Sequence, residues 1–104
     1  MNILEKIKNQ IDSNKVILYM KGDPDFPQCG FSARACHALH DCNVDFAHVD
    51  ILVEQDIRVA LPEYADWPTF PQLWVNGELV GGCDIIVEMH ASGELQTLLT
   101  EAVK

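Results

Sequence analysis

The sequence predicts an α/β fold in which helices cover both faces of a mixed four-stranded sheet, giving three layers. Segments with strand-like and helix-like patterns alternate over the first two-thirds of the chain, and this alternation favours parallel strands joined by right-handed crossovers. Farther along, two apolar runs flank Asn76-Gly77, the favoured pair for a tight antiparallel hairpin. With 104 residues, 48% of them hydrophobic, the chain is expected to form a single domain over residues 1–104.

The first half of the chain is expected to form a helix, a strand, a loop and a second helix. Asn2 and Glu5 resemble a capping box at a helix start, and apolar residues follow at helical spacing: Ile3, Leu4, Ile7 and Ile11. The segment KVILYMK (15–21) is apolar on both faces, like a buried strand, and GDPDFPQ (22–28) is typical of a loop. A helical period then returns over about 31–41, with one side formed by Phe31, Ala35, Ala38 or Leu39, and Cys42.

The second half is expected to form a strand (44–51), a helix (54–64), the hairpin and two final helices. The helix over 54–64 is predicted to face inward through Ile57, Leu61 and Tyr64, and Pro62 weakens its last turn because proline lacks a backbone donor. After the hairpin, Asp84 is expected to cap a short helix over 85–90. The last helix, over 94–103, has an apolar side formed by Leu95, Leu98, Leu99 and Ala102.

Composition excludes some classes of function. The formal net charge of −9, from 16 acidic and 7 basic residues, argues against a nucleic-acid partner, because phosphate binding needs clustered Lys and Arg. No apolar run is long enough to span a bilayer, and the N-terminus lacks the pattern of a signal peptide. We therefore expect a cytoplasmic protein without a membrane partner. Its four cysteines are then expected to be free thiols, redox groups or metal ligands rather than a disulfide framework: Cys29, Cys36, Cys42 and Cys83.

Cys29 is the first candidate for chemistry. It follows a proline-containing loop and precedes a predicted helix, where unpaired N–H groups and the helix dipole favour a thiolate. The thiolate is the form that acts as nucleophile and metal ligand. Lys21, at the end of the preceding strand, can add positive charge, and Gly30 permits close approach of a ligand. A reactive site is favoured here over a buried, inert cysteine.

Two other segments have a functional and an ordinary interpretation. In WPTFPQL (67–73), a cis bond before Pro71 would turn the Phe70 backbone toward solvent for pairing with an extended peptide, but an ordinary proline-rich loop is about equally consistent. In GGCDI (81–85), two glycines and the start of a helix suit a ligand that carries an ammonium and a carboxylate. A simple N-cap at Asp84 is the commoner explanation, and Cys83 fits packing as well as chemistry.

Weaker candidates lie on the second and third helices. Cys36 and His40 are one helical turn apart, a spacing that zinc ligands use, yet no second pair completes a tetrahedral set. We interpret Cys36 and Cys42 mainly as small helix residues. Arg58 is either an exposed base or an anchor for a carboxylate, and its spacing alone favours the former.

Several segments together closely resemble the monothiol glutaredoxins with a Cys-Gly-Phe-Ser motif: MKGDPDFPQCGFSARA and IRVALPEYADWPTFPQLWVNGELVGGCDI. The similarity extends from about Leu4 to Leu99, with the motifs K-G, C-G-F-S, W-P-T-x-P and G-G-C-D in the same order. The resemblance implies the thioredoxin fold, in agreement with the element order above, and a cis bond before Pro71. One departure is Pro62, which stands where many relatives carry Lys.

The resemblance also implies roles for individual residues. In the family, a lysine and an arginine at the positions of Lys21 and Arg58 hold the glycine carboxylate of glutathione. The residue before the cis proline, here Phe70, pairs with the glutathione backbone. Cys83 and Asp84 match the positions that take the γ-glutamyl end. Cys29 would be both the thiol nucleophile and the metal ligand.

The implied function is to bind a glutathione-ligated 2Fe–2S cluster at a dimer interface and to transfer it in iron–sulfur cluster biogenesis. A 2Fe–2S cluster needs four ligands, typically thiolates. Cys29 from each of two chains and two glutathione molecules supply them, so a homodimer is expected when the cluster is bound. Iron–sulfur recipient proteins and a BolA-like protein are the partners that the resemblance implies. The alternative is a glutathione-dependent thiol–disulfide oxidoreductase, for which weak turnover is expected.

Overall fold

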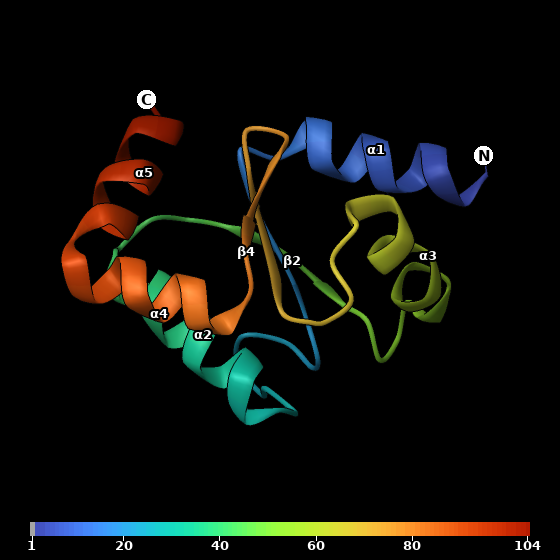
Figure 1. The fold of residues 1–104 in the computed structure, drawn as a ribbon, viewed down its shortest axis with the longest axis horizontal. Helices are drawn as coiled ribbons and strands as arrows, with labels where there is room; N and C mark the ends of the chain where they lie inside the picture. The colour runs from blue at the N-terminus through green and yellow to red at the C-terminus, as the bar shows by residue number, and fades with distance from the viewer. Residues whose placement is uncertain (1) are drawn as a thin grey trace.

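The computed structural model describes residues 2–104 and has the predicted order of elements (Figure 1). Within that range the helices are α1 (Ile3–Ser13), α2 (Gly30–Asp41), α3 (Gln55–Ala65), α4 (Cys83–Ser92) and α5 (Glu94–Ala102). The strands are β1 (Val16–Met20), β2 (Ala47–Asp50), β3 (Gln72–Val75) and β4 (Glu78–Gly81).

The four strands form one mixed sheet in the order β2-β1-β3-β4. β1 pairs in parallel with β2 and antiparallel with β3, and β3 pairs antiparallel with β4. All five residues of β1 are buried, as its apolar pattern predicted. β2 is shorter than predicted because pairing with β1 begins only at Ala47.

The hairpin turn at Asn76-Gly77 is confirmed. Asn76 has φ of 49° and Gly77 has φ of 81°, so both central residues lie in the left-handed region. This is the geometry of a type I′ turn, whose twist matches that of the flanking strands. The turn returns the chain to the edge of the sheet and sets where β4 ends, immediately before α4.

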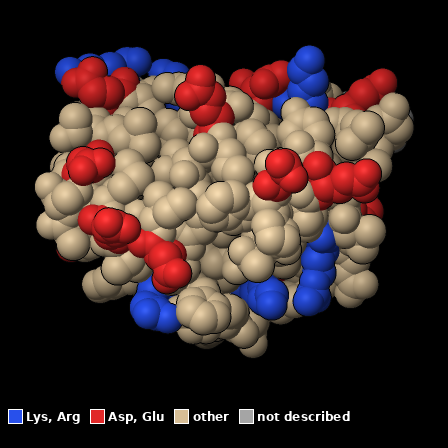
Figure 2. Space-filling view, viewed as in Figure 1, with Lys and Arg blue, Asp and Glu red and all other residues tan. Residues whose placement is uncertain are grey.

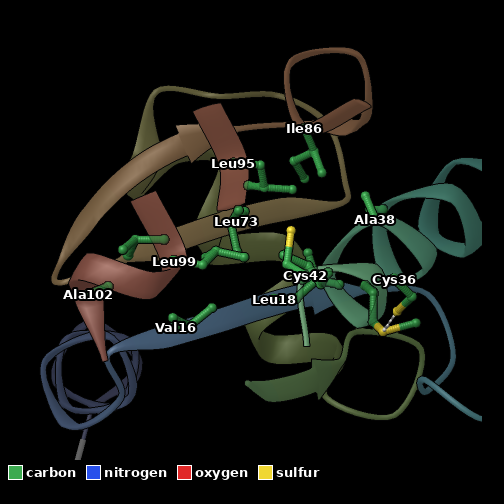
Figure 3. Packing of buried hydrophobic residues seen from close by; sticks show 14 residues of the cluster. Val16, Leu18, Cys36, Ala38, Cys42, Leu73, Ile86, Leu95, Leu99 and Ala102 are labelled. Carbon is green, nitrogen blue, oxygen red and sulfur yellow. Dashed lines mark hydrogen bonds between the residues drawn. The ribbon is translucent and has the colours of Figure 1, made fainter. Parts of the chain in front are cut away.

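Helices cover both faces of the sheet, which Figure 1 shows nearly edge-on. α2, α4 and α5 lie on one side, and α1 and α3 lie on the other. Each side has its own apolar core. The first includes Leu18, Leu39, Leu73 and Ile86 (Figure 3), and the second includes Ile7, Tyr19, Ile57 and Leu61. The predicted three-layer arrangement is therefore confirmed.

Two aromatic residues predicted on the apolar sides of their helices are exposed in the structure. Tyr64 is 42% exposed, because Ile57 and Leu61 already fill the buried side of α3 and Tyr64 lies at its end, with its ring 6.2 Å from that of Trp74. Phe31 is 53% exposed, because it lies in the first turn of α2, before the helix packs on the sheet. Periodicity alone does not distinguish the middle of a helix from its ends.

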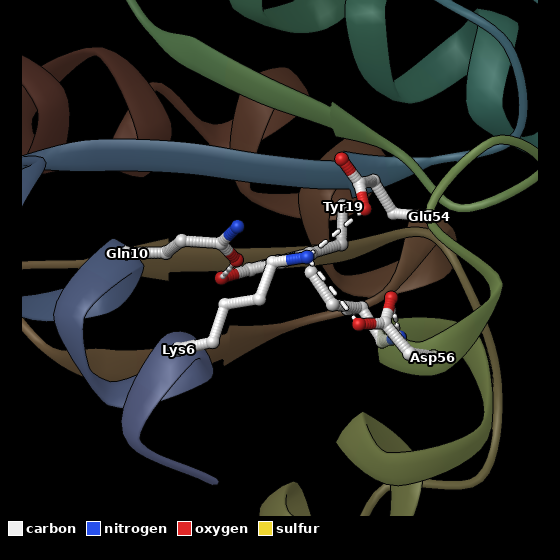
Figure 4. A network of polar contacts seen from close by, with 6 residues as sticks. Lys6, Gln10, Tyr19, Glu54 and Asp56 are labelled. Atoms are coloured by element: carbon white, nitrogen blue, oxygen red, sulfur yellow. Dashed lines mark hydrogen bonds and ion pairs between the residues drawn. The ribbon is translucent and has the colours of Figure 1, made fainter. Parts of the chain in front are cut away.

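Polar contacts tie α1 to the start of α3 (Figure 4). Nζ of Lys6 lies 3.0 Å from Oε2 of Glu54 and 3.3 Å from Oδ2 of Asp56. The two carboxylates raise the pKa of Lys6. Nearby, the hydroxyl of the buried Tyr19 donates to Oε1 of Gln10 at 2.9 Å. These contacts, with the apolar packing between the helices, fix α3, which carries Arg58.

Candidate functional site

A cavity of about 700 Å³ opens where the residue after β1, the start of α2, α3, the segment before β3 and the start of α4 meet. All five residues proposed from the sequence to hold a ligand line it: Lys21, Arg58, Phe70, Cys83 and Asp84. Sequence reasoning assigned the remaining lining residues no individual ligand role, although five of them belong to the two candidate segments 67–73 and 81–85: Phe31, Pro62, Trp67, Pro68, Thr69, Gly82 and Ile85. The structure therefore gathers segments from five parts of the chain into one cleft.

Cys29, at the N-cap position of α2, does not itself line the cleft but lies beside it, close enough to interact electrostatically with the lining residue Cys83. Its backbone is extended, with φ of −153° and ψ of 136°, and its carbonyl accepts the first helical bond from Ala33 at 2.8 Å. The thiol is partly exposed. The backbone N–H of Ser32 lowers the pKa of Cys29; burial opposes this, and the Phe31 N–H, the Lys21 charge and the Ser32 hydroxyl assist it. The prediction of an activated thiol at a helix start agrees with this geometry.

The other three cysteines have the opposite environment. Burial, assisted by the Asp23 charge, raises the pKa of Cys36 to about 11, and its Sγ donates to Sδ of Met20 at 3.3 Å (Figure 3). Burial also raises the pKa of Cys42 and of Cys83. All four thiols are free. Cys29 is thus the cysteine whose surroundings favour the reactive thiolate.

The loop between β1 and α2 is fixed at both ends around Lys21. The Lys21 N–H donates to Oγ of Ser32 at 3.1 Å, and the Lys21 carbonyl accepts from Gln28 at 2.9 Å. The next residue, Gly22, has φ of 87° and donates to Oδ1 of Asp50 at 3.0 Å. A Cβ on Gly22 would lie 2.5 Å from the Phe26 carbonyl oxygen, so the loop requires glycine there.

The segment before β3 forms another wall of the cleft. The Phe70–Pro71 bond is cis, as the resemblance implied. Behind this wall lies Gln72, which is fully buried and donates from Nε2 to the carbonyls of Trp67 at 3.0 Å and Thr69 at 3.2 Å. In the sequence, Gln72 is flanked by Pro71 and Leu73, and this pattern did not indicate that its side chain bonds to the wall of the cleft.

The start of α4 forms the opposite wall. The helix begins at Cys83, with Gly82 at the N-cap, and Asp84 makes no side-chain cap. The prediction that Asp84 caps the helix is therefore wrong; the helix starts two residues earlier than expected, which places the Asp84 carboxylate in its first turn, lining the cleft. A Cβ on Gly82 would lie 3.2 Å from the Pro71 carbonyl oxygen, so the two walls approach closely at this glycine.

The residues of α2 and its C-cap considered as zinc ligands do not lie together; some are in the core and others on the surface. Cys36 and Cys42 are buried, whereas His37 and His40 are exposed. His40 instead contacts the ring of Phe46. Within residues 2–104, no three His, Cys, Asp or Glu side chains lie together in a way that could hold a metal ion.

Acidic side chains are spread over the face shown in Figure 2, in keeping with the net charge of −9. Lys and Arg side chains appear along the upper edge and along the lower edge, the end of the molecule where Figure 1 shows the start of α2. Within residues 2–104, no helix has the length and apolar character to cross a membrane.

Comparison with known proteins agrees with this geometry. A family model described as Glutaredoxin matches residues 16–80, a range that includes Cys29, Arg58 and Phe70. The chain belongs to the glutaredoxin family. It is 65% identical to Glutaredoxin 4 of Pasteurella multocida, over 97% of this chain and 93% of that protein. It is 62% identical to Glutaredoxin 4 of Escherichia coli K12, over 94% of this chain and 85% of that protein.

Solved glutaredoxins share the fold. The solution structure of reduced poplar apo GrxS14 has a TM-score of 0.82 and 46% identity, covering 97% of this chain and 93% of that one. The crystal structure of a buckwheat glutaredoxin–glutathione complex has a TM-score of 0.83 and 26% identity, covering 96% of this chain and 89% of that one. The fold is thioredoxin-like, as the resemblance implied. With one cysteine in its Cys-Gly-Phe-Ser motif, the protein is a glutaredoxin of the monothiol type.

Proposed function

We propose that this monothiol glutaredoxin binds glutathione in the cleft and carries a 2Fe–2S cluster, shared between two copies of the chain, to recipient proteins. The observation that carries the proposal is the position of Cys29. Its thiol has a lowered pKa, is partly exposed and lies beside a cleft lined by two cationic side chains, Lys21 and Arg58.

Glutathione fits the donors of the cleft. The tripeptide carries two carboxylates, an ammonium and a thiol. In the proposal, Lys21 and Arg58 bind its glycine carboxylate and the Phe70 backbone pairs with its backbone. The γ-glutamyl end lies at the start of α4, where the backbone N–H groups suit a carboxylate and the Asp84 carboxylate suits the ammonium. The buckwheat relative solved as a glutathione complex supports this assignment.

The arrangement of thiols supports sharing the cluster between chains. A 2Fe–2S cluster takes four ligands, and the thiols of Cys36, Cys42 and Cys83 are buried, with raised pKa values. Cys29 from two copies and the thiols of two glutathiones complete the set. Phe26 and Phe31, on either side of Cys29 in the sequence, are 72% and 53% exposed, and a second copy would cover them. Because half of the ligands are not part of the chain, the cluster is suited to transfer.

Anaerobic reconstitution with iron, sulfide and glutathione tests the proposal. We expect a visible absorption band and a dimer mass for the wild-type protein. Cys29→Ser should remain colourless and monomeric. The matched control is Cys42→Ser, which removes a buried thiol at the opposite end of α2 from Cys29 and should retain the cluster. A colourless wild-type monomer would rule out the cluster-carrier function.

The lowered pKa of Cys29 also favours a second candidate, a glutathione-dependent oxidoreductase. In this reaction the Cys29 thiolate attacks the glutathione sulfur of a protein–glutathione disulfide and releases the protein thiolate. A free glutathione thiolate then attacks the Cys29–glutathione disulfide, forms glutathione disulfide and regenerates Cys29. Steady-state turnover with a glutathionylated peptide separates the two candidates: turnover near background, together with cluster binding, identifies the carrier.

The proposal extends to partners and location. A carrier of this kind would act in the cytoplasm on iron–sulfur recipient proteins and would form a mixed dimer with a BolA-like protein. Co-purification of the reconstituted protein with a BolA-like protein, followed by spectroscopy of the complex, tests this extension. We expect a heterodimer whose visible spectrum differs from that of the homodimer. The reason is that the BolA-like protein would replace the cluster ligands supplied by one copy of the chain.

A further inference from the structure

We propose that Gln72 is a positioning residue for ligand binding: its buried amide holds the wall of the cleft formed by residues 67–70 in the conformation that accepts glutathione. The inference rests on the proposed binding of glutathione in this cleft. Gln72 itself does not line the cavity.

The Gln72 amide is almost fully used. The side chain has 0% exposure, and Nε2 donates to the carbonyl oxygens of Trp67 at 3.0 Å and Thr69 at 3.2 Å. Its Oε1 accepts from Nε1 of Trp74 at 3.2 Å. Three of the four hydrogen bonds that an amide can make are therefore present, as a buried polar side chain requires.

The two carbonyls belong to a wall without regular structure. Residues 67–70 lie outside the helices and strands, although Trp67, Pro68, Thr69 and Phe70 all line the cavity. The N-terminal end of the wall is attached to α3 by a bond from the Trp67 N–H to the Pro62 carbonyl, at 3.0 Å. Gln72 attaches it to β3 of the sheet. The Gln72 side chain thus links the wall to the sheet in place of a ladder of backbone bonds.

The wall is also coupled to the start of α4. A Cβ on Gly82 would lie 3.4 Å from Nε1 of Trp67 and 3.2 Å from the Pro71 carbonyl oxygen, so the indole packs closely on Gly82. Nε1 of Trp67 is buried and has no hydrogen-bond partner within residues 2–104, so packing, not hydrogen bonding, holds the indole there. Movement of Trp67 would change the separation between Phe70 and the Cys83–Asp84 end of the cleft.

The chemistry of the site requires an amide at Gln72. Two donors and one acceptor are needed in one side chain. Gln72→Met keeps a similar length and volume but removes all three bonds. Gln72→Glu adds a carboxylate that donates nothing and opposes two carbonyl oxygens, so it should have the larger effect. Neither variant touches the groups that lower the pKa of Cys29, which lie on α2 and at Lys21, directly after β1.

The experiment compares glutathione affinity by calorimetry in wild type, Gln72→Met and Tyr19→Phe. Tyr19→Phe is the matched control, because it also removes a hydrogen bond from a fully buried side chain, but that bond joins the hydroxyl to Gln10 on α1. We expect both variants to lower thermal stability, and only Gln72→Met to lower affinity, by about tenfold, equivalent to the loss of a hydrogen bond or two. The iodoacetamide pH profile of Cys29 should remain unchanged in both.

A second measurement needs no ligand. In the unliganded proteins, the NMR signals of the Thr69 and Phe70 amides and of the Trp67 indole should shift in Gln72→Met and stay in place in Tyr19→Phe. If Gln72→Met does not fold, Trp74→Phe replaces it. This variant leaves Gln72 in place and removes the donor that orients Oε1, together with part of the volume of the buried indole. A two- to threefold loss of affinity is then expected, which corresponds to about half of the free energy of one hydrogen bond.

The outcomes separate the two proposals. Absence of glutathione binding by the wild-type protein overturns the proposed function. Wild-type binding with equal affinity in Gln72→Met overturns the role of Gln72, as does an equal loss in Tyr19→Phe, which would show a general effect of destabilisation. A loss confined to Gln72→Met, with an unchanged Cys29 profile, supports it.

Discussion

The backbone N–H of Lys21 donates to the hydroxyl oxygen of Ser32, with 3.1 Å between the two atoms. Ser32 is fully buried, and its backbone N–H and its hydroxyl both lower the pKa of Cys29. One serine therefore connects Lys21, directly after β1, with Cys29, the N-cap of α2. In this motif Ser32 has a structural and electrostatic function of its own, in addition to excluding a second cysteine.

Ser32→Ala should raise the pKa of Cys29. The hydroxyl is removed, and the Lys21 N–H loses its acceptor, while the Ser32 backbone N–H, which has the larger effect on the thiol, remains at the helix start. The increase is therefore expected to be partial. The pH dependence of iodoacetamide reaction measures it. Ser92→Ala, which removes a serine hydroxyl at the end of α4, is the control and should leave the profile unchanged.

Cys36→Ala should reduce the loss of stability at alkaline pH. The folded pKa of Cys36 is raised to about 11, so the neutral thiol favours the folded state below the unfolded pKa, and this contribution disappears as the pH rises through the folded value. Between about pH 8 and about pH 10, the wild-type protein should lose about 1 kcal/mol more free energy of unfolding than Cys36→Ala. Urea titrations at both pH values measure the difference. Equal losses in both proteins would contradict the assignment.

Gly30→Ala should separate folding from cluster assembly. A Cβ at Gly30 meets no atom within 4 Å, and alanine is the better helix former, so stability should be unchanged or higher by up to about 1 kcal/mol. The added methyl group nevertheless projects beside Cys29, on the surface where a second copy is proposed to bind. We therefore expect Gly30→Ala to lose the cluster faster than the wild-type protein. The rate at which the visible absorbance decays measures this loss.

Gly82→Ala is the counterpart of that experiment. Here a Cβ would lie 3.2 Å from the Pro71 carbonyl oxygen, and the backbone must yield. Overpacking of this kind costs about 1–3 kcal/mol. Thermal unfolding should therefore show a lower midpoint than for wild type, and calorimetry should show weaker glutathione binding. A variant that binds glutathione normally would show that the two walls of the cleft can separate without effect.

Arg58→Met should weaken glutathione binding by about tenfold, the expected effect of removing a charge-assisted hydrogen bond to a carboxylate. Arg58 is exposed and lines the cleft, so the substitution should have little effect on folding. The control is Lys8→Met on α1, which changes the net charge equally outside the cleft. Affinity should also fall with ionic strength for the wild-type protein and less steeply for Arg58→Met.

Local patterns were sufficient to predict most of the fold. The Asn76-Gly77 pair specified its hairpin because few residues adopt a left-handed backbone without strain, and the apolar run in β1 specified a central strand. Apart from β2, which is shorter than predicted, the errors fell at the ends of helices. Phe31, Tyr64 and Asp84 each lie in a first or last turn, where side chains meet loops whose positions depend on tertiary structure.

The site was predictable where it depends on local sequence, as most of the fold was. Cys29 is activated by the local geometry of a helix start, so its character follows from neighbouring residues. Placing Arg58 in the same cleft required the family resemblance, because its spacing alone gave no signal. Gln72 escaped both approaches: its partners, Trp67 and Thr69, are close in sequence, but only the folded loop turns their carbonyls toward the amide.

The contrast between Cys29 and the buried cysteines has a practical consequence. Near neutral pH, an electrophile that requires a thiolate should modify Cys29 first, while Cys36, Cys42 and Cys83 stay protonated and shielded. A spin label or fluorophore can therefore be attached at the proposed interface of the native sequence, without replacing any other cysteine. Because the label occupies the thiol proposed as the cluster ligand, the labelled chain should stay monomeric, and assembly of the cluster-bound dimer should protect Cys29 from labelling.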